Sequence, residues 1–181
     1  MLIIYRFLIN LVFLLSPIIL IFRFIKKKEH KNRFKEKFCF FSKKRKKGQV
    51  LWFHGASVGE IQSIIPIIEK LEKKNDINQI LITSNTLSSS KIIEKFNFRK
   101  VVHQFFPIDT NYHSKKFLDF WNPSIAFFID SEIWPNTIIN LESKKIPIVI
   151  LNGRLTGKSF KRWKNLPSFS NFIFKKITLC L

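Results

Sequence analysis

The stretch at residues 49–71 constrains the fold more than any other part of this sequence. It begins with four apolar residues, 50–53, which have the length and composition of a buried strand. A turn of small and polar residues follows at 54–59. From Glu60 onward, apolar residues recur every three or four positions, as they do in an amphipathic helix. The stretch therefore predicts a strand, a tight glycine-containing turn and a helix.

The same alternation repeats to the end of the chain. We predict further strands at residues 79–82, 101–106, 124–129, 146–151 and 177–181, and helices over 88–96, over 111–121 and from 134 onward. Strands separated by helices of this length form a parallel, Rossmann-like α/β sheet with helices on both faces. Because the sequence stops inside the last predicted strand, we expect a truncated chain.

The first 25 residues are predominantly apolar. A helix over the most apolar part, 7–22, reaches about 24 Å, which is short of a hydrocarbon core of about 30 Å. Extending the helix back to Leu2 gives enough length but includes Arg6. No small-residue cleavage site follows, which disfavours a cleaved signal peptide. We predict an uncleaved membrane anchor at 1–25, either a marginal span or a helix that lies in the interface.

A dense basic block follows the apolar segment and contributes much of the net charge of +20. Beside an apolar anchor, the block at 26–48 indicates a cytoplasmic location for the rest of the chain and attraction to anionic lipid. Nucleic-acid binding and a solvated linker are the alternatives. Aromatic residues among the basic ones partly fit stacking on nucleic acid; these are Phe34, Phe38, Phe40 and Phe41. That interpretation leaves the α/β motifs unexplained, so we expect no nucleic-acid partner.

Cysteine usage indicates neither a disulfide framework nor a thiolate metal site. The only two cysteines, Cys39 and Cys180, are far apart and lack ligand spacing. A reducing compartment fits this usage.

Polar residues follow each predicted strand at the point where it ends. The clusters are 54–60, 83–86, Asp109, 130–132 and 152–154. In a parallel sheet, these loops converge on one edge, which is where such sheets bind ligands. The pattern predicts where the site lies and leaves its chemistry open.

Each polar candidate also has a structural interpretation. Ser57 and Glu60 match a capping box, in which Ser57 caps the helix and Glu60 bonds back to the Ser57 N–H. Alternatively, Glu60 is a general base beside a glycine turn that lets a substrate approach closely. Asp130 and Glu132 would also suit the positive end of a helix dipole. Arg154 is either a surface ion-pair partner or a ligand for phosphate or carboxylate.

The glycine spacing at 55–59 is neither a dinucleotide fingerprint nor a P-loop, because no Gly-Lys-Ser/Thr follows it. Nucleotide binding by this part of the chain is therefore not indicated. His54 is better explained as a packed histidine at a strand end than as a catalyst.

Four ordered motifs resemble the N-terminal half of bacterial 3-deoxy-D-manno-octulosonic acid (Kdo) transferases. They are HGASVGE (54–60), FPID (106–109), SEIWPN (131–136) and NGRLTGKS (152–159). The apolar start and the basic RFKEKF (33–38) also resemble that family's membrane-associated N-terminus. Two positions depart from the family pattern. The turn at 83–89 lacks the usual Thr-Gly ending, and Asp130 stands where the family often has Glu.

The resemblance implies an inverting glycosyltransferase of the two-domain GT-B type at the cytoplasmic face of the inner membrane. Such an enzyme transfers Kdo from CMP-Kdo to the lipid A precursor and needs neither a metal nor another cofactor. Glu60 matches the family's proposed catalytic base, and Glu132 would assist at the same edge. The expected substrate-binding residues are Ser57, Gly59, Asp130, Asn152 and Arg154. Charge complementarity suits Arg154 and the basic segment to the acceptor's phosphates.

These inferences divide the chain into an anchor (1–25), a basic juxtamembrane segment (26–48) and a Rossmann-like N-terminal GT-B domain (49–181). The C-terminal domain, which would supply most of the CMP-Kdo site, is expected to be absent, and the chain alone is expected to be inactive. The alternative function is a non-catalytic, membrane-bound lipid A-binding module or a truncated remnant.

Overall fold

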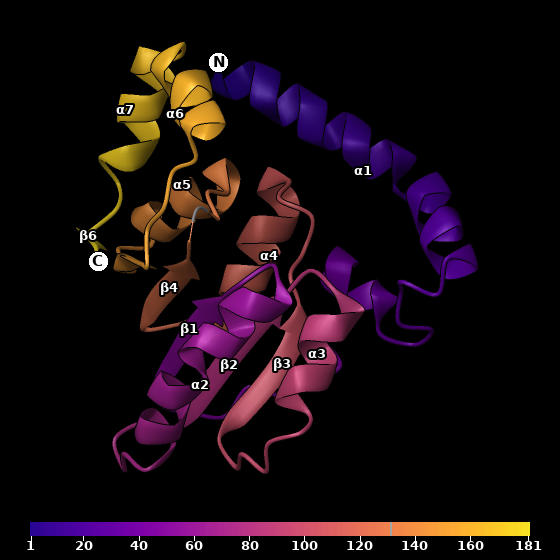
Figure 1. Ribbon diagram of the computed structural model, residues 1–181, viewed down its shortest axis with the longest axis vertical. Helices are drawn as coiled ribbons and strands as arrows, with labels where there is room; N and C mark the ends of the chain where they lie inside the picture. The colour runs from indigo at the N-terminus through magenta and orange to yellow at the C-terminus, as the bar shows by residue number, and fades with distance from the viewer. Residues whose placement is uncertain (131) are drawn as a thin grey trace.

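A parallel sheet lies at the centre of the molecule (Figure 1). The computed structural model describes residues 1–130 and 132–181. Its strands are β1 (Val50–His54), β2 (Gln79–Ser84), β3 (Val101–Phe105), β4 (Ile125–Ile129), β5 (Ile148–Leu151) and β6 (Leu179–Cys180). Their order is β3-β2-β1-β4-β5-β6, and each neighbouring pair is parallel. The predicted α/β class with a parallel sheet is confirmed.

Helices alternate with the strands along the chain. They are α1 (Leu2–Ile25), α2 (Val58–Glu72), α3 (Leu87–Ile93), α4 (Asn111–Trp121), α5 (Pro135–Ser143), α6 (Gly157–Lys164) and α7 (Pro167–Phe174), with a 3-10 helix η1 (Phe34–Phe38). Pro135 occupies the first turn of α5, where its missing N–H costs nothing. The helix predicted over 88–96 ends at Ile93, and residues 94–96 continue as a tighter turn.

Two apolar cores lie on opposite faces of the sheet. Side chains alternate along a strand, so in β1 Val50 and Trp52 point to one face while Leu51 and Phe53 point to the other. Helices α4, α5 and α7 cover the first face, and α2 and α3 cover the second. Because both faces are covered, the strands are nearly continuous apolar runs.

The strand order reverses between β1 and β4. The chain moves outward from β1 through β2 to β3, and then returns to place β4 on the other side of β1. Ligands of such sheets bind in the crevice outside the carboxyl ends of the strands at this reversal. The turn after β1 carries Glu60, and the segment after β4 carries Asp130 and Glu132. The topology therefore places the predicted catalytic residues on the two sides of the crevice.

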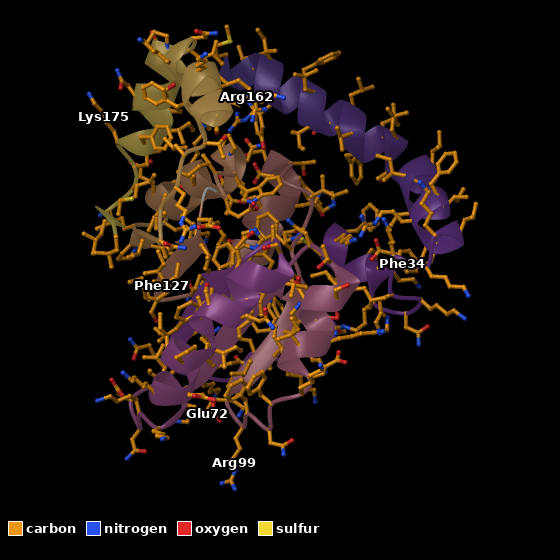
Figure 2. All side chains as sticks on the ribbon, in the orientation of Figure 1. Phe34, Glu72, Arg99, Phe127, Arg162 and Lys175 are labelled. Atoms are coloured by element: carbon orange, nitrogen blue, oxygen red, sulfur yellow. The ribbon has the colours of Figure 1, made fainter. Side chains whose placement is uncertain are left out.

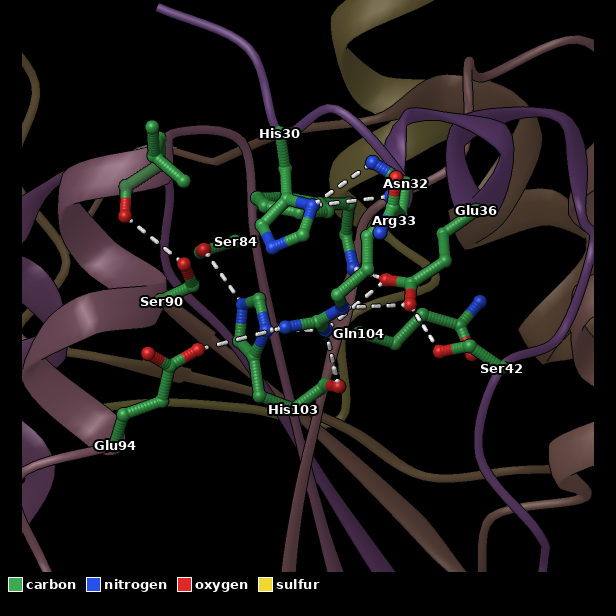
Figure 3. Close-up of polar contacts among 12 residues, drawn as sticks. His30, Asn32, Arg33, Glu36, Ser42, Ser84, Ser90, Glu94, His103 and Gln104 are labelled. Atoms are coloured by element: carbon green, nitrogen blue, oxygen red, sulfur yellow. Dashed lines mark hydrogen bonds and ion pairs between the residues drawn. The ribbon is translucent and has the colours of Figure 1, made fainter.

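The basic segment 26–48 is folded onto the edge of the sheet. Glu36 is buried and accepts hydrogen bonds from Nε of Arg33 (2.8 Å), from the backbone N–H of Phe105 (2.8 Å) and from the Ser42 hydroxyl (Figure 3). Phe105 belongs to the edge strand β3, so this carboxylate occupies a backbone donor that would otherwise be open to pairing. The segment is therefore not a solvated linker.

The phenylalanines of this segment pack mainly against the protein itself. Phe34 packs edge-on against Phe24 at 5.2 Å between ring centroids, and Phe41 stacks on Phe120 at 3.8 Å. Phe38 lies 6.0 Å from Phe13, while Phe40 is exposed. Apart from Phe40, the rings that the nucleic-acid interpretation needed as stacking platforms are occupied.

Helix α1 extends alongside the α/β unit and is hydrogen-bonded to it near its start (Figure 1). Near its start, the Tyr5 hydroxyl donates to Asp109 Oδ2 (2.7 Å) and Nε of Arg6 donates to Asn136 Oδ1 (3.0 Å). Near its end, Nε of Arg23 donates to Glu29 Oε2 (2.7 Å). The helix is long and apolar enough to cross a membrane.

The outer side of α1 is apolar, and side chains project from it away from the α/β unit (Figure 2). Its exposed apolar residues include Ile3, Ile4, Phe7, Leu8, Leu11, Leu14, Leu15, Ile18, Ile21, Phe22 and Ile25. The polar residues Tyr5 and Arg6 instead bond to the α/β unit, and Arg23 bonds to Glu29 of the basic segment. Because apolar residues such as Ile9, Val12 and Ile19 also line its inner side, α1 is apolar nearly all round, unlike an ordinary amphipathic surface helix.

His103 is expected to lower the free energy of unfolding as the pH falls from about 6.5 to about 3. Its ring accepts a hydrogen bond from Arg33 at Nδ1 (2.9 Å) and lies 2.9 Å from the Ser84 hydroxyl at Nε2. Burial, reinforced by Arg33, lowers the pKa of His103 from 6.5 to about 3. Because the unfolded chain takes up this proton first, the stability from neutral His103 is full above about pH 6.5 and is lost toward pH 3.

Urea unfolding across that pH range checks this prediction. The variant His103→Gln keeps an acceptor for Arg33 and a donor for Ser84 but does not titrate. Its free energy of unfolding should fall less steeply with acidification than that of the wild type. Equal slopes for the two proteins would contradict the prediction.

Candidate functional site

The turn after β1 holds the Glu60 side chain in a defined position. Ser57 caps α2, since its hydroxyl oxygen accepts from the Glu60 N–H at 3.3 Å. In return, Glu60 Oε1 accepts from the Ser57 hydroxyl (2.6 Å), and Oε2 accepts from the backbone N–H of Ala56 (2.8 Å). The predicted capping box is present, but the prediction that Glu60 bonds to the Ser57 N–H was wrong. The carboxylate reaches one residue further back, to Ala56.

Gly55 provides the space that the Glu60 side chain occupies. A Cβ at Gly55 would lie 3.1 Å from Glu60 Cβ and 3.2 Å from Ile61 Cδ1, closer than ordinary contact. A Cβ at Gly59 would have no heavy atom within 4 Å, so Gly59 faces open space. The required glycine of this turn is therefore Gly55, and substrate contact at Gly59 stays a prediction.

His54, Trp134 and Glu132 form a hydrogen-bonded group at the ends of β1 and β4. The indole N–H of Trp134 lies 3.1 Å from His54 Nε2 and 2.9 Å from Glu132 Oε2, so one donor serves both acceptors. His54 is fully buried, and its Nδ1 lies 2.9 Å from the Thr83 hydroxyl. An imidazole with its hydrogen on Nδ1 satisfies both contacts. His54 is thus packed, as expected, and it also helps to orient Trp134.

Asp130, Asn152 and Arg154 form a second group at the ends of β4 and β5. Nδ2 of Asn152 donates to Asp130 Oδ1 (3.1 Å), and Arg154 donates to Asn152 Oδ1 through Nε (3.3 Å). Asp130 and Asn152 both have left-handed backbone, with φ of 58° and 56°, directly after their strands. Aspartate and asparagine tolerate this conformation better than most residues. Arg154 is largely exposed, which leaves most of its guanidinium donors open to a ligand.

Asp109 has a structural role, although it follows a strand like the other candidates. Its carboxylate is buried and accepts from the backbone N–H groups of Asn136 (3.0 Å) and Thr137 (2.9 Å), in the first turn of α5. It also accepts from the Tyr5 hydroxyl of α1. Burial raises the pKa of Asp109 to about 6, even though these hydrogen bonds favour the charged form. Asp109 therefore caps α5 and does not face the crevice.

The predicted site residues thus fall into three groups along one edge of the sheet. Ser57 bonds to Glu60, Glu132 bonds to Trp134, and Asp130 bonds to Asn152 and is near Arg154. In the described part of the chain, no hydrogen bond or ion pair joins Glu60 to Glu132 or to Arg154. Ser131, the first residue of the SEIWPN motif, lies outside the described residues.

Sequence reasoning missed the hydrogen bonds of Trp134, which it treated as the start of a helix and as part of the SEIWPN motif. The available signal was local: an indole donor two positions after the carboxylate of Glu132. Across residues 1–130 and 132–181, no cluster of three His, Cys, Asp or Glu side chains is placed to hold a metal ion.

Asp109→Asn is expected to lower the free energy of unfolding by roughly 2–3 kcal/mol. The amide has one uncharged oxygen, which accepts more weakly than a carboxylate, and an NH2 group that would face donors. Urea unfolding measures the change. Asp119→Asn is the matched control, since Asp119 is exposed and, among the described residues, forms one ion pair, with Lys144 at the surface. A loss for Asp109→Asn no larger than for the control would show that the buried hydrogen bonds do not stabilise the structure.

Comparison with known proteins gives consistent matches. The family model described as 3-deoxy-D-manno-octulosonic-acid transferase (kdotransferase) matches residues 32–181. The 3-deoxy-D-manno-octulosonic acid transferase of Rickettsia bellii is 35% identical over 92% of this chain, and that of Haemophilus influenzae is 27% identical over 94%. A probable mitochondrial 3-deoxy-D-manno-octulosonic acid transferase of Arabidopsis thaliana is 36% identical over 90%.

The chain spans about two fifths of the length of these curated relatives, with 37%, 40% and 41% covered in the Arabidopsis, Rickettsia and Haemophilus proteins. The matched residues include β1 to β6 and the turns that carry Glu60, Glu132 and Arg154. The chain belongs to the Kdo transferase family and corresponds to its N-terminal domain.

Proposed function

We propose that this chain is the acceptor-side domain of a Kdo transferase and carries its catalytic base. The reaction is the inverting transfer of Kdo from CMP-Kdo to the lipid A precursor, in an enzyme of the two-domain GT-B type. One observation carries the proposal: the Glu60 carboxylate is held by Ala56 and Ser57 at the crevice beside the strand reversal, and it is only partly buried. Parallel sheets bind their ligands there.

Two hydrogen bonds leave Glu60 able to accept a proton. Each carboxylate oxygen uses one lone pair, on the Ala56 N–H or on the Ser57 hydroxyl, and keeps another free. Glu60 would take the proton of the acceptor hydroxyl as that oxygen attacks the anomeric carbon of Kdo. The bond from that carbon to the CMP phosphate oxygen breaks, and the phosphate leaves with the electron pair. Because phosphate is a good leaving group, one general base suffices.

Glu132 and Arg154 would act on the other side of the crevice. The Trp134 indole N–H fixes one oxygen of Glu132, so the carboxylate is oriented without being neutralised. Arg154, which is mostly exposed, has the forked geometry that binds phosphate or carboxylate. Ser57, Gly59, Asp130 and Asn152 complete the proposed substrate-binding set, with Ser57 also positioning Glu60.

A chimera tests the proposal. This chain replaces the matched N-terminal region of the Rickettsia bellii transferase, and Kdo transfer from CMP-Kdo to a lipid A precursor is measured. We expect the chimera to be active and Glu60→Gln to reduce its kcat by about 100-fold or more, because the base is lost. Glu69→Gln, an exposed change on the same helix, should leave the rate unaltered.

Other outcomes of this assay separate the alternatives. The chain alone should release no CMP, because the donor site is expected in another domain. CMP release by the chain alone would contradict that division of labour. An inactive chimera whose N-terminal chain still binds lipid A precursor would instead favour a non-catalytic lipid-binding module.

We further propose that α1 lies flat in the cytoplasmic leaflet of the inner membrane, with the α/β unit in the cytoplasm. Tyr5 bonds to Asp109, and the centroid of the Phe13 ring lies 4.9 Å from that of His113. Arg23, 18 positions after Tyr5, lines a cavity together with Ser57 and Lys91. The helix thus follows the folded unit along most of its length, which argues against a helix that crosses the bilayer. The outward apolar side would enter the acyl boundary, and the adjacent lysines would meet anionic headgroups.

Site-directed labelling tests this orientation. Leu2→Cys and Lys28→Cys are made separately in a Cys180→Ser background, since Cys180 is exposed while Cys39 is buried. On the outside of sealed vesicles, both positions should react with a membrane-impermeant thiol reagent. Protection of only one end would indicate a spanning helix and would refute the in-plane arrangement.

A further inference from the structure

A basic cavity lies between the end of α1 and the starts of α2 and α3. Its volume is about 470 Å³. Arg23, Lys27 and Lys28 line one side, and Lys91 of α3 lines the other. The hydroxyl-bearing residues Ser57 and Ser88 also border it.

The positive charge of this cavity is only partly balanced. Glu29, which is buried next to it, is bound by both Arg23 and Lys37. Burial acts to raise the pKa of Glu29, but the hydrogen bonds from these two cations outweigh it and leave that pKa below its usual value. This single negative charge is therefore already shared between two positive ones.

The lysines of the cavity have no acidic partners. Across residues 1–130 and 132–181, the ammonium groups of Lys27, Lys28 and Lys91 form no ion pair. Like charges gathered from two separate elements repel each other unless an anion is present. A ligand with a high negative charge would relieve that repulsion.

A phosphomonoester suits the charge of this cavity better than a carboxylate or a phosphodiester does. A phosphomonoester carries a charge near −2 and three acceptor oxygens, enough for several cations and hydroxyls at once. A carboxylate or a phosphodiester carries a single charge. The volume also leaves room for the group to which the phosphate is attached.

A second groove indicates that the ligand is amphiphilic. It lies beneath α1, has a volume of about 260 Å³, and is lined by apolar side chains that include Ile9, Val12, Ile19 and Phe106. Arg23 borders both this groove and the basic cavity. An acyl chain and a phosphate of the same molecule would find complementary surroundings side by side.

We infer that this basic cavity binds the phosphomonoester group of an amphiphilic ligand. Ser57 connects the cavity to the catalytic region, because it borders the cavity and donates to Glu60 Oε1. The identification of that ligand with the sugar acceptor rests on the proposed function; the binding of a phosphomonoester does not. On that basis, the bound phosphate sets the acceptor hydroxyls beside Glu60.

Vesicle co-sedimentation of the full chain tests the inference. Phosphatidylcholine vesicles contain either phosphatidic acid, a phosphomonoester, or phosphatidylglycerol, a phosphodiester, at matched surface charge. We expect tighter binding to phosphatidic acid, and about tenfold loss of that preference in Lys28→Gln/Lys91→Gln, which removes one cation from each wall. Lys28→Arg/Lys91→Arg should retain it.

The matched control is Lys73→Gln/Lys74→Gln. This pair removes the same charge from the exposed end of α2, away from the cavity. Equal losses in the two glutamine pairs would show general electrostatic attraction to the membrane and overturn the inference. So would equal wild-type binding to the two anionic lipids.

Competition with inorganic phosphate distinguishes two sources of the same chemistry. In one outcome, inorganic phosphate displaces the wild type from phosphatidic acid vesicles but does not displace Lys28→Gln/Lys91→Gln from phosphatidylglycerol vesicles. That result would show that the cavity recognises the phosphate group alone. In the other outcome, inorganic phosphate does not displace the wild type, and the preference for phosphatidic acid still depends on Lys28 and Lys91. That result would show that the cavity recognises phosphate only when a lipid presents it. Either result upholds phosphomonoester binding.

Different results would overturn the inference about the cavity and the proposed transferase function. Glu60→Gln should keep the preference for phosphatidic acid while abolishing transfer in the chimera. An active chimera built from a chain without that preference would overturn the cavity's role only. A chain with the preference in an inactive chimera would overturn the transferase assignment only.

Discussion

The carboxylate of Asp109 connects parts of the structure that are otherwise far apart in the sequence. A buried carboxylate is costly unless several donors reach it. Here the donors come from α1, through Tyr5, and from the first turn of α5, through Asn136 and Thr137. The N-cap residue of α5, Trp134, offers no side-chain cap of its own. Because Asp109 fixes this turn, the Trp134 indole is held where it can reach His54 and Glu132.

Buried acidic residues also organise the basic segment. With a net charge of +20, the chain would be expected to keep such a segment extended by self-repulsion. Instead, Glu36 is bound by Arg33 and Glu29 is bound by Arg23 and Lys37, and both carboxylates are buried. Two of the few acidic residues therefore fold the segment onto β3 and the end of α1. Lys27 and Lys28, which form no ion pair within the described residues, face the cavity.

The fold could be predicted from the sequence because its signals are local. Strands buried on both faces are continuous apolar runs, as in β1, and a parallel sheet collects its strand ends on one edge. Helices α6 and α7 were not predicted. Each is only eight residues long, and α6 has just two apolar residues, Phe160 and Trp163, so neither gives an apolar repeat long enough to predict a helix.

The location of the site was predictable for the same reason, whereas its hydrogen bonds were not. Trp134 and His54 are 80 positions apart, and Tyr5 and Asp109 are 104 apart. No local pattern encodes such contacts. Even within the turn, Glu60 accepts from the backbone N–H of Ala56 and not from that of Ser57, in the space left by Gly55, which spacing alone does not reveal.

The position of α1 determines how a membrane-bound acceptor would reach Glu60. The groove beneath α1 is lined on its other side by Asn85, Phe106 and Trp134, which follow β2, β3 and β4. The helix therefore runs along the carboxyl edge of the sheet. Its inner side faces the crevice, and its apolar outer side faces away from it. An α-helix with side chains is about 10 Å across, so the proposed membrane surface would stand about one helix diameter from the crevice. On the proposed function, a sugar headgroup would span that distance while its acyl chains stay in the bilayer, so the whole lipid would not have to be extracted.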